Sequence, residues 1–313
     1  MKKKISIVMP FYNEEKNLLE IFNNLKIKVI DVNQQNYNFE VLLMNNNSTD
    51  NSSNIAKEII NKFSYVKYYK MSRNFGYQAN IKAGYDLCTG DAAVQLDTDG
   101  EDDPELINSF IKKWESGYDV VYGLRIKRKE KKILSLARNL FYFFLRKYAT
   151  FDIPEKAGDF RLLDRKVINH LKRFDEKNLY LRGLISYVGF NQTGINYERK
   201  ERLSGNSKFS LLDYFSLSFN AIASFTKKPL LLIFYLGTFF SFINFILIPI
   251  YLLLFLFGIV ETRGFTTLIL IILFFFGFLT LLIGILGIYI GYILDEVKNR
   301  PVYIIDENEN KNI

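Results

Sequence analysis

The chain has 313 residues, of which 49% are hydrophobic and 24% are charged, and its formal net charge at pH 7 is +8. A chain this long and this apolar can bury a full hydrophobic core, which excludes intrinsic disorder. Its single cysteine, Cys88, excludes an internal disulfide and fits a reducing compartment. The positive charge alone does not decide whether the partner is nucleic acid, an anionic lipid or a phosphorylated substrate.

Short apolar runs alternate with amphipathic stretches in the first part of the chain. The runs predicted to be strands are Ile5–Met9, Phe39–Met44, Val66–Met71, Ala92–Leu96 and Asp119–Gly123. This alternation is typical of βαβ units, so we expect an α/β fold with a mostly parallel, Rossmann-like sheet. Ligands of such sheets bind beyond the carboxyl ends of the strands, where the polar segments YNEE, NNNSTD and DTDGEDD follow.

Two basic stretches rich in aromatic residues, at about 131–150 and 208–226, predict amphipathic helices. A single such helix is most often an ordinary surface helix that packs on its own domain. Two of them close to an apolar C-terminal part favour helices that lie in a membrane interface.

Two long apolar runs, about 230–258 and 265–294, follow Lys228. Each exceeds the ~20 apolar residues that a helix needs to cross a bilayer, whereas the alternative, a hairpin buried in a soluble core, does not need such length. The linker IVETRG is short, and lysine and arginine flank the outer ends of both runs, so we expect a transmembrane hairpin with cytoplasmic ends. The expected parts are a cytoplasmic domain at 1–228, two spans within 229–294 and a cytoplasmic tail at 295–313.

Five carboxylates crowd the segment QLDTDGEDDP, which directly follows the end of a predicted strand. They are Asp97, Asp99, Glu101, Asp102 and Asp103. Like charges this close repel unless a cation or water screens them, and their oxygen atoms suit a hard metal ion. A solvated acidic turn is the alternative. The position of the glycine in this segment excludes an EF-hand calcium loop.

Motifs along nearly the whole chain resemble those of glycosyltransferase family 2. SIVMPFYNEEKNL is similar to the family's first strand and nucleotide loop, NNNSTD to its base-binding turn, RNFGYQANIKAG to its third-strand motif, and LDTDGEDDPELI to its Asp-X-Asp segment. AGDFRLLDRKV, YLRGLISYVGF and YERKERLSGNSKFSLLDY resemble signatures of the branch with dolichol-phosphate mannose synthase and bacterial polyisoprenyl-phosphate glycosyltransferases. The resemblance implies a GT-A fold, a divalent metal, a nucleotide diphosphate sugar and a polyprenyl phosphate acceptor.

The same resemblance implies where the donor and the metal bind. The nucleoside would contact Pro10, Tyr12, Glu14, Met44 and Asn46, the ribose and diphosphate would lie along Asp97, Thr98 and Asp99, and Lys208 would bind a phosphate. Asp99 and Glu101 would hold Mg²⁺ or Mn²⁺. The chain departs from the family at two points. It has Asn45 and Asn46 where the base-binding turn usually begins with two aspartates, which leaves the base preference open, and Glu101 where glutamine is common.

A set of basic residues fits an anionic acceptor, because the guanidinium group binds phosphate oxygens in pairs. The residues expected to bind the lipid phosphate are Arg125, Arg138, Arg161, Arg182, Arg199 and Arg202. Arginines are also ordinary surface residues, which is the alternative for several of them. No RNA-binding signature accompanies the charge, so we expect no nucleic-acid partner. His170 is the only histidine, which excludes histidine-based zinc sites and a Ser-His-Asp triad.

We therefore expect an inverting glycosyltransferase that moves a sugar, UDP-linked by the resemblance, onto a polyprenyl phosphate such as undecaprenyl phosphate at the cytoplasmic face of the cell membrane. The catalytic residues would be Asp99, Asp159, Arg125 and Arg202. A lipid monophosphate has a second pKa near ~6 and is mostly dianionic, so it hardly needs a base. Asp159 would act as that base or would only orient Arg161. The resemblance also implies a homo-oligomer, a tetramer.

Two other functions stay open. A processive polysaccharide synthase would share the nucleotide fold and the spans, but such enzymes resemble one another in a Gln-X-X-Arg-Trp motif, and the only tryptophan here, Trp114, lies in FIKKW. A non-catalytic membrane protein that binds a nucleotide or a lipid would give no product with any nucleotide sugar.

Overall fold

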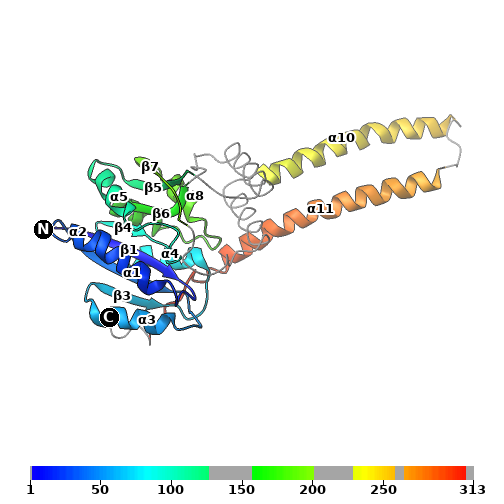
Figure 1. Cartoon of the computed structure of the whole chain (residues 1–313). Coiled ribbons are helices and arrows are strands. Elements are labelled where there is room, and N and C mark those ends of the chain that lie inside the picture. Colours follow the sequence, from blue (N-terminus) through cyan, green and yellow to red (C-terminus); the bar gives the residue numbers. More distant parts are fainter. Residues whose placement is uncertain (1, 127–156, 201–227, 258–263, 308–313) are drawn as a thin grey trace. The chain divides into compact units, whose positions relative to one another are not determined.

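The computed structural model describes residues 2–126, 157–200, 228–257 and 264–307 (Figure 1). The chain divides into two compact units, Met1–Ser218 with Pro301–Ile313, and Phe219–Arg300. The expected interfacial helices at 131–150 and 208–226 lie outside the described residues, as do the candidate site residues Arg138, Arg202 and Lys208.

The first unit is built on a seven-stranded sheet. The strands are β1 (Lys3–Phe11), β2 (Tyr37–Asn45), β3 (Val66–Lys70), β4 (Ala92–Gln95), β5 (Val120–Arg125), β6 (Ala157–Asp164) and β7 (Gln192–Tyr197). They lie in the order β3-β2-β1-β4-β6-β5-β7. Strands β3, β2, β1 and β4 are parallel, β6 is antiparallel to both of its neighbours, and β5 and β7 are parallel. This mostly parallel sheet confirms the expected α/β, GT-A-like fold.

The chain order of the strands marks a ligand position. From β1 the chain proceeds outward to β2 and β3, and it then returns to place β4 on the other side of β1. The connections that follow β1 and β4 therefore lead in opposite directions, and ligands of such sheets bind outside the carboxyl ends of these two strands. The loop with five carboxylates follows β4 at this position.

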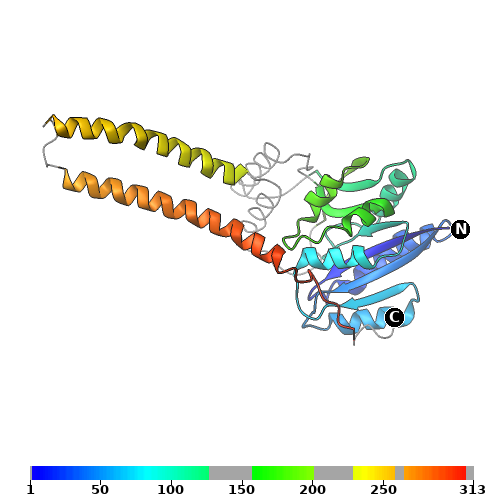
Figure 2. The ribbon, with the colours of Figure 1, turned by 180° about the vertical axis from the view of Figure 1, so that it is seen from behind.

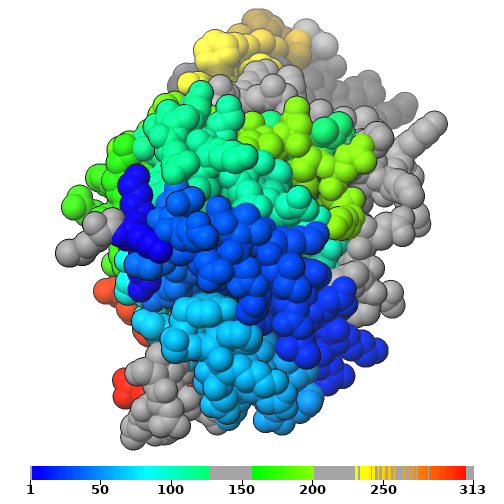
Figure 3. All heavy atoms as spheres, turned by 60° about the vertical axis from the view of Figure 1, so that its left-hand side comes forward, coloured from blue at the N-terminus to red at the C-terminus, as the bar shows by residue number. Residues whose placement is uncertain are grey.

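Helices cover the sheet and complete its core (Figures 1 and 2). They are α1 (Leu18–Leu25), the π-helix η1 (Lys26–Ile30), α2 (Asp31–Asn33), α3 (Ser52–Lys62), α4 (Tyr77–Leu87), α5 (Leu106–Glu115), α7 (Arg165–Leu171) and α8 (Leu181–Val188). Ile5 to Phe11 are all buried, as expected for a central strand that is covered on both faces. Phe22 of α1 and Phe110 of α5 are fully buried in the same hydrophobic cluster. In the face shown in Figure 3, segments from the first half of the chain form one continuous surface over this core.

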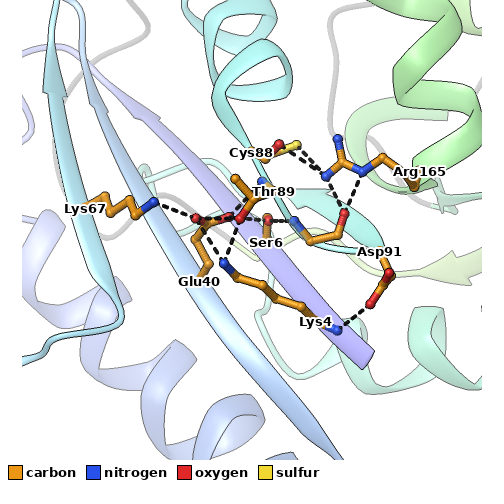
Figure 4. Close-up of polar contacts among 9 residues, drawn as sticks. Lys4, Ser6, Glu40, Lys67, Cys88, Thr89, Asp91 and Arg165 are labelled. Atoms are coloured by element: carbon orange, nitrogen blue, oxygen red, sulfur yellow. Dashed lines mark hydrogen bonds and ion pairs between the residues drawn. The ribbon is translucent and has the colours of Figure 1, made fainter. Parts of the chain in front are cut away.

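A buried carboxylate, Glu40 of β2, binds side chains of β1 and β3 and the loop that precedes β4 (Figure 4). Its oxygens accept hydrogen bonds from Ser6 Oγ at 2.7 Å and from the backbone N–H of Thr89 at 2.9 Å. Lys67 Nζ lies 3.1 Å away and Lys4 Nζ 3.4 Å away. Burial alone would raise the pKa of Glu40, but the hydrogen bonds from Ser6, Thr89 and Lys67 outweigh it and lower the pKa to about 2. Glu40 is therefore a charged structural residue.

Next to this cluster, Arg165, the first residue of α7, binds the loop that precedes β4 (Figure 4). Its Nε donates to the carbonyl oxygen of Gly90 at 2.7 Å, and its NH2 donates to the carbonyl oxygen of Cys88 at 3.2 Å. Cys88 is a free, buried thiol, and burial raises its pKa. It is a small core residue, as its isolation in the sequence predicts.

The C-terminal tail belongs to the first unit. Ile305 forms an antiparallel bridge with Met71, directly after β3. The N–H of Ser72 donates to the carbonyl of Ile304 at 3.0 Å, and the N–H of Asp306 donates to the carbonyl of Lys70 at 2.8 Å. The tail thus satisfies backbone groups at the outer end of an edge strand, which would otherwise be open to other chains.

The second unit consists of two apolar helices, α10 (Lys228–Leu256) and α11 (Phe265–Val297). Of the residues that the structure describes, one segment, Phe274–Val297, is long and apolar enough to be identified as a candidate span, with a mean hydropathy of 2.3. The hairpin with spans at 230–258 and 265–294 stays a prediction.

Candidate active site

The loops that follow β1, β2 and β3 are tied to one another at the carboxyl end of the sheet. The amide of Asn46 donates to Asn74 Oδ1 at 2.8 Å, and its oxygen accepts from the N–H of Phe75 at 3.0 Å. The N–H of Glu14 donates to Ser52 Oγ at 2.8 Å. These loops carry most of the residues expected to hold the nucleoside, so the structure places Tyr12, Glu14 and Asn46 at one edge.

Two other nucleoside candidates, Pro10 and Met44, are paired residues of β1 and β2, and both are buried. Asn45 is also fully buried, and its side chain stabilises the turn after β2. Its amide donates to Ser53 Oγ and to Tyr68 OH, each at 2.8 Å, and its oxygen accepts from the N–H of Ser48. Asparagine at this position therefore has a structural role.

Asp97 and Thr98 begin the acidic loop beyond β4. Thr98 is buried and donates from Oγ1 to the carbonyl of Pro10 at 3.2 Å, which ties this loop to β1. Asp97 Oδ1 accepts from Tyr77 OH and from Gln95 Nε2, each at 2.7 Å. Burial, and then repulsion from Asp99 and other carboxylates, raise the pKa of Asp97 to about 7.

Asp99, Glu101 and Asp102 converge on one guanidinium group, that of Arg199. The distance from Arg199 NH2 to Asp99 Oδ2 is 3.8 Å, and Arg199 Nε lies 3.4 Å from Asp102 Oδ1. Arg199 NH1 forms a close ion pair with Glu101 Oε2. Burial is the largest cause that raises the pKa of Asp99, and repulsion from Glu101 adds to it. Arg199, which was expected to bind the lipid phosphate, contacts the acidic loop in this structure, and its contact with the lipid stays a prediction.

Two of these three carboxylates, Asp99 and Glu101, are the expected ligands of the metal. Among the residues that the structure describes, no group of three His, Cys, Asp or Glu side chains is placed to hold an ion together. Asp99 and Glu101 nevertheless both reach the guanidinium group of Arg199, so the two carboxylates lie near each other. Mg²⁺ is commonly bound by one or two carboxylates together with substrate phosphates and water, so two such residues fit a metal that arrives with a diphosphate.

Arg125, at the end of β5, is buried against Asp102 and Tyr197. Its NH2 lies 3.5 Å from Asp102 Oδ2, and its Nε donates to Tyr197 OH at 3.1 Å. Tyr197 OH in turn donates to Asp102 Oδ1 at 2.5 Å. A Cβ at Gly158 would lie only 2.7 Å from Arg125 NH2, so any larger residue here would displace the guanidinium group. Tyr197 was missed by the sequence analysis, although it opens one of the branch signatures.

Asp159 of β6 forms a two-pronged ion pair with Arg182 of α8. Arg182 Nε donates to Asp159 Oδ1 at 2.9 Å, and its NH2 donates to Oδ2 at 2.6 Å. Burial would raise the pKa of Asp159, but the charges of Arg182, Arg161 and Arg125 outweigh it and lower the pKa to about 2. The buried Arg161 donates instead to the carbonyl of Gly158 at 2.5 Å. Both oxygens of the Asp159 carboxylate, the group that would act as a base, thus bind Arg182.

Comparisons with known proteins identify the family of the chain. The family model for glycosyl transferase family 2 matches residues 6–172. The chain is 44% identical to the uncharacterized glycosyltransferase YkcC of Bacillus subtilis (strain 168), over 98% of this chain and 96% of that protein. It is 33% identical to the bactoprenol glucosyl transferase of Shigella phage SfII, over 99% of both chains. Mannosyl-3-phosphoglycerate synthase from Rubrobacter xylanophilus, a solved structure, is 16% identical over 70% of this chain and 71% of its own, with a TM-score of 0.46. The chain belongs to glycosyl transferase family 2, in its polyprenyl-phosphate glycosyltransferase branch.

Proposed function

We propose that this protein transfers a sugar from a nucleotide diphosphate sugar to a polyprenyl phosphate. The observation that carries the proposal is the convergence of Asp99 and Glu101 on one cationic position beyond β4, at the crevice where an open α/β sheet binds its ligand. Relatives of matching length are named bactoprenol glucosyl transferases, which supports a polyprenyl phosphate as acceptor and makes UDP-glucose the first donor to test.

The donor side of the site would bind the nucleotide and its diphosphate. Pro10, Tyr12, Glu14, Met44 and Asn46 come from loops and strand ends that contact one another, which fits a shared nucleoside site. Asp97, Thr98 and Asp99 would follow the ribose and diphosphate, with Lys208 on a phosphate. Asp99 and Glu101 would hold Mg²⁺ or Mn²⁺, and such a metal offsets the negative charge that develops on the departing diphosphate.

The acceptor side would bind the lipid phosphate through arginines. Arg182 and Arg161 lie near Asp159, and Arg138 and Arg202 are proposed to join them. With a pKa of about 2 and two bonds from Arg182, Asp159 is a weak base, so we assign it the role of orienting arginine. The phosphate itself, largely dianionic above its second pKa of ~6, would attack the anomeric carbon directly and invert it.

The apolar helices would hold the enzyme at its lipid substrate. We propose that α10 and α11 form a transmembrane hairpin, with the catalytic unit on the cytoplasmic face of the cell membrane. The proposal rests on the apolar length of both helices and on the basic residues Lys227, Lys228, Lys298 and Arg300 at their outer ends. Undecaprenyl phosphate is the proposed carrier, and a tetramer the proposed assembly.

The test is to incubate the purified full chain with polyprenyl phosphate, Mn²⁺ and a panel of UDP- and GDP-linked sugars, and to determine the glycolipid mass. One added sugar per lipid is the expected product. A ladder of longer products would indicate a processive polysaccharide synthase instead. Absence of glycolipid with every donor, from protein that still binds nucleotide, would favour a non-catalytic binding protein.

A further inference from the structure

We propose that Arg199 is an internal counter-ion that occupies the acidic loop in the metal-free protein and must leave before a divalent metal can bind. The inference rests on the proposed function, because it concerns the metal assigned there to Asp99 and Glu101. It changes the role of Arg199 from a lipid-phosphate ligand to a competitor of the metal.

The residues on both sides of Arg199 are hydrogen-bonded to the acidic loop, one through a side chain and one through the backbone. Two residues before it, Tyr197 OH donates to Asp102 Oδ1 at 2.5 Å. One residue after it, the N–H of Lys200 donates to the carbonyl of Glu101 at 2.9 Å. Arg199 therefore starts from an anchored position, and its side chain is only 27% exposed. Its place among the carboxylates follows from the path of the chain after β7.

The three carboxylates around Arg199 are poorly exposed. The side chains of Asp99, Glu101 and Asp102 are 16%, 13% and 0% exposed. Arg125 pairs with Asp102, and Arg199 is a cation that, within the described residues, reaches both Asp99 and Glu101. Like charges held this close cost free energy in the folded protein, and a neighbouring positive charge offsets that cost.

A guanidinium group and a hard metal ion need the same oxygens. While Arg199 bridges Asp99 and Glu101, a metal cannot approach both, and its binding includes the cost of breaking these ion pairs. Once displaced, the planar fork of an arginine is well suited to the oxygens of a diphosphate. Metal and nucleotide would then bind together more readily than either binds alone.

The experiment measures Mn²⁺ binding to the full chain in detergent by electron paramagnetic resonance, without nucleotide. Arg199→Gln removes the competing cation, and we expect it to bind Mn²⁺ about three- to tenfold more tightly than the wild type. Lys200→Gln is the matched control, because it removes one positive charge from the next residue. Lys200 pairs with Asp103 at 2.5 Å, and its anchoring N–H is retained in the variant.

A thermal shift gives the second readout. Arg199→Gln should melt at a lower temperature than the wild type without metal, and Mn²⁺ should raise its melting temperature by more. Arg199→Met, which keeps the length of the side chain, replaces Arg199→Gln if that variant does not fold, with the same expectation.

The outcomes distinguish failure of this inference alone from failure of the proposed metal site. Mn²⁺ binding that is unchanged or weaker in Arg199→Gln, or equally tightened in Lys200→Gln, would overturn the role of Arg199 and leave metal-dependent transfer standing. If no protein bound Mn²⁺, even with UDP present, the proposed metal and the role of Arg199 would fail together.

Discussion

Carboxylates lie near both ends of β4, one before it and a group after it, and the protein surrounds their charges in opposite ways. At its beginning, Glu40 is a single acid with hydrogen bonds from Ser6 and Thr89 and two lysines nearby. At its end, Asp97, Asp99 and Glu101 crowd one loop, and one arginine bridges two of them. The first arrangement lowers the pKa of its carboxyl, and the second raises the pKa of Asp97 and Asp99.

The difference separates stability from function. A carboxylate that is fully hydrogen-bonded favours the folded state, and its loss should reduce stability. Crowded carboxylates oppose folding because they repel one another. Such groups are typical of functional sites, where their negative charge attracts a cation. Substitutions at the two ends of β4 should therefore have opposite effects on stability and on catalysis.

The largest effect is expected at the crowded end, for Asp99→Asn. The substitution keeps the size of the side chain and removes a charge that would oppose the metal, so transfer should slow at least ~100-fold. Because one repelling charge is lost, the metal-free protein should melt at the same temperature or higher. Glycolipid formation and thermal shift measure the two effects. A folded variant with near-normal, Mn²⁺-dependent turnover would remove Asp99 from the proposed mechanism.

The reverse result is expected for Glu40→Gln. A neutral amide cannot accept from Ser6, Thr89 and Lys67 as a carboxylate does, so unfolding should require about 2 kcal/mol less free energy. Transfer, measured well below the melting temperature, should remain normal. Glu58→Gln on α3 is the control, because Glu58 is an exposed carboxylate. A Glu40→Gln variant as stable as the control would show that the Glu40 cluster does not stabilise the fold.

Acid should abolish the same stabilisation. The pKa of Glu40 is lowered from an ordinary value of 4.5 to about 2, so the stability that its charge contributes is complete above pH 4.5. It is lost as the pH falls from there through about 2. The difference in unfolding free energy between the wild type and Glu40→Gln should shrink over this window, as followed by denaturant titrations. A difference that grew toward acid pH would contradict the assigned charge state.

The smallest effect is expected for Tyr197→Phe, which tests one hydrogen-bonded contact of the acidic loop. The ring is kept, and the hydroxyl that joins Arg125 to Asp102 is lost, so stability should fall by about 1 kcal/mol. Transfer should slow by about fivefold if Arg125 shifts accordingly. Tyr65→Phe is the control, because in the described part of the chain its buried hydroxyl has no hydrogen-bond partner. Equal effects of the two substitutions would show that the Tyr197 contacts do not position Arg125.

The sequence predicted the parallel half of the sheet well, because β1 to β4 are short apolar runs separated by amphipathic helices. No strand was predicted for the segments that form β6 and β7. Asp159 and Arg161 of β6 are buried charged residues. They interrupt the apolar pattern by which a buried strand is recognised in a sequence.

Candidate site residues could be identified one by one, but their partners could not. Arg199 and Asp99 are 100 positions apart in the chain, and only the order of β4, β6, β5 and β7 brings them together. The same holds for Asp159, which was expected to act as a base or to orient Arg161. Its hydrogen bonds go to Arg182 of α8, and the charge of Arg161 also lowers its pKa.

The tail that pairs with Met71 and Ser72 also restricts how the chain can thread a bilayer. The catalytic unit precedes α10, and residues 304–306, beyond α11, are hydrogen-bonded to that same unit. A chain that leaves from and returns to one side must cross an even number of times. A single crossing by Phe274–Val297 would put Ile305 on the wrong side of the membrane from its partner. If α10 and α11 are the only segments that cross, both of them cross or neither does, and a reporter of sidedness placed after Ile313 should agree with one placed before Met1.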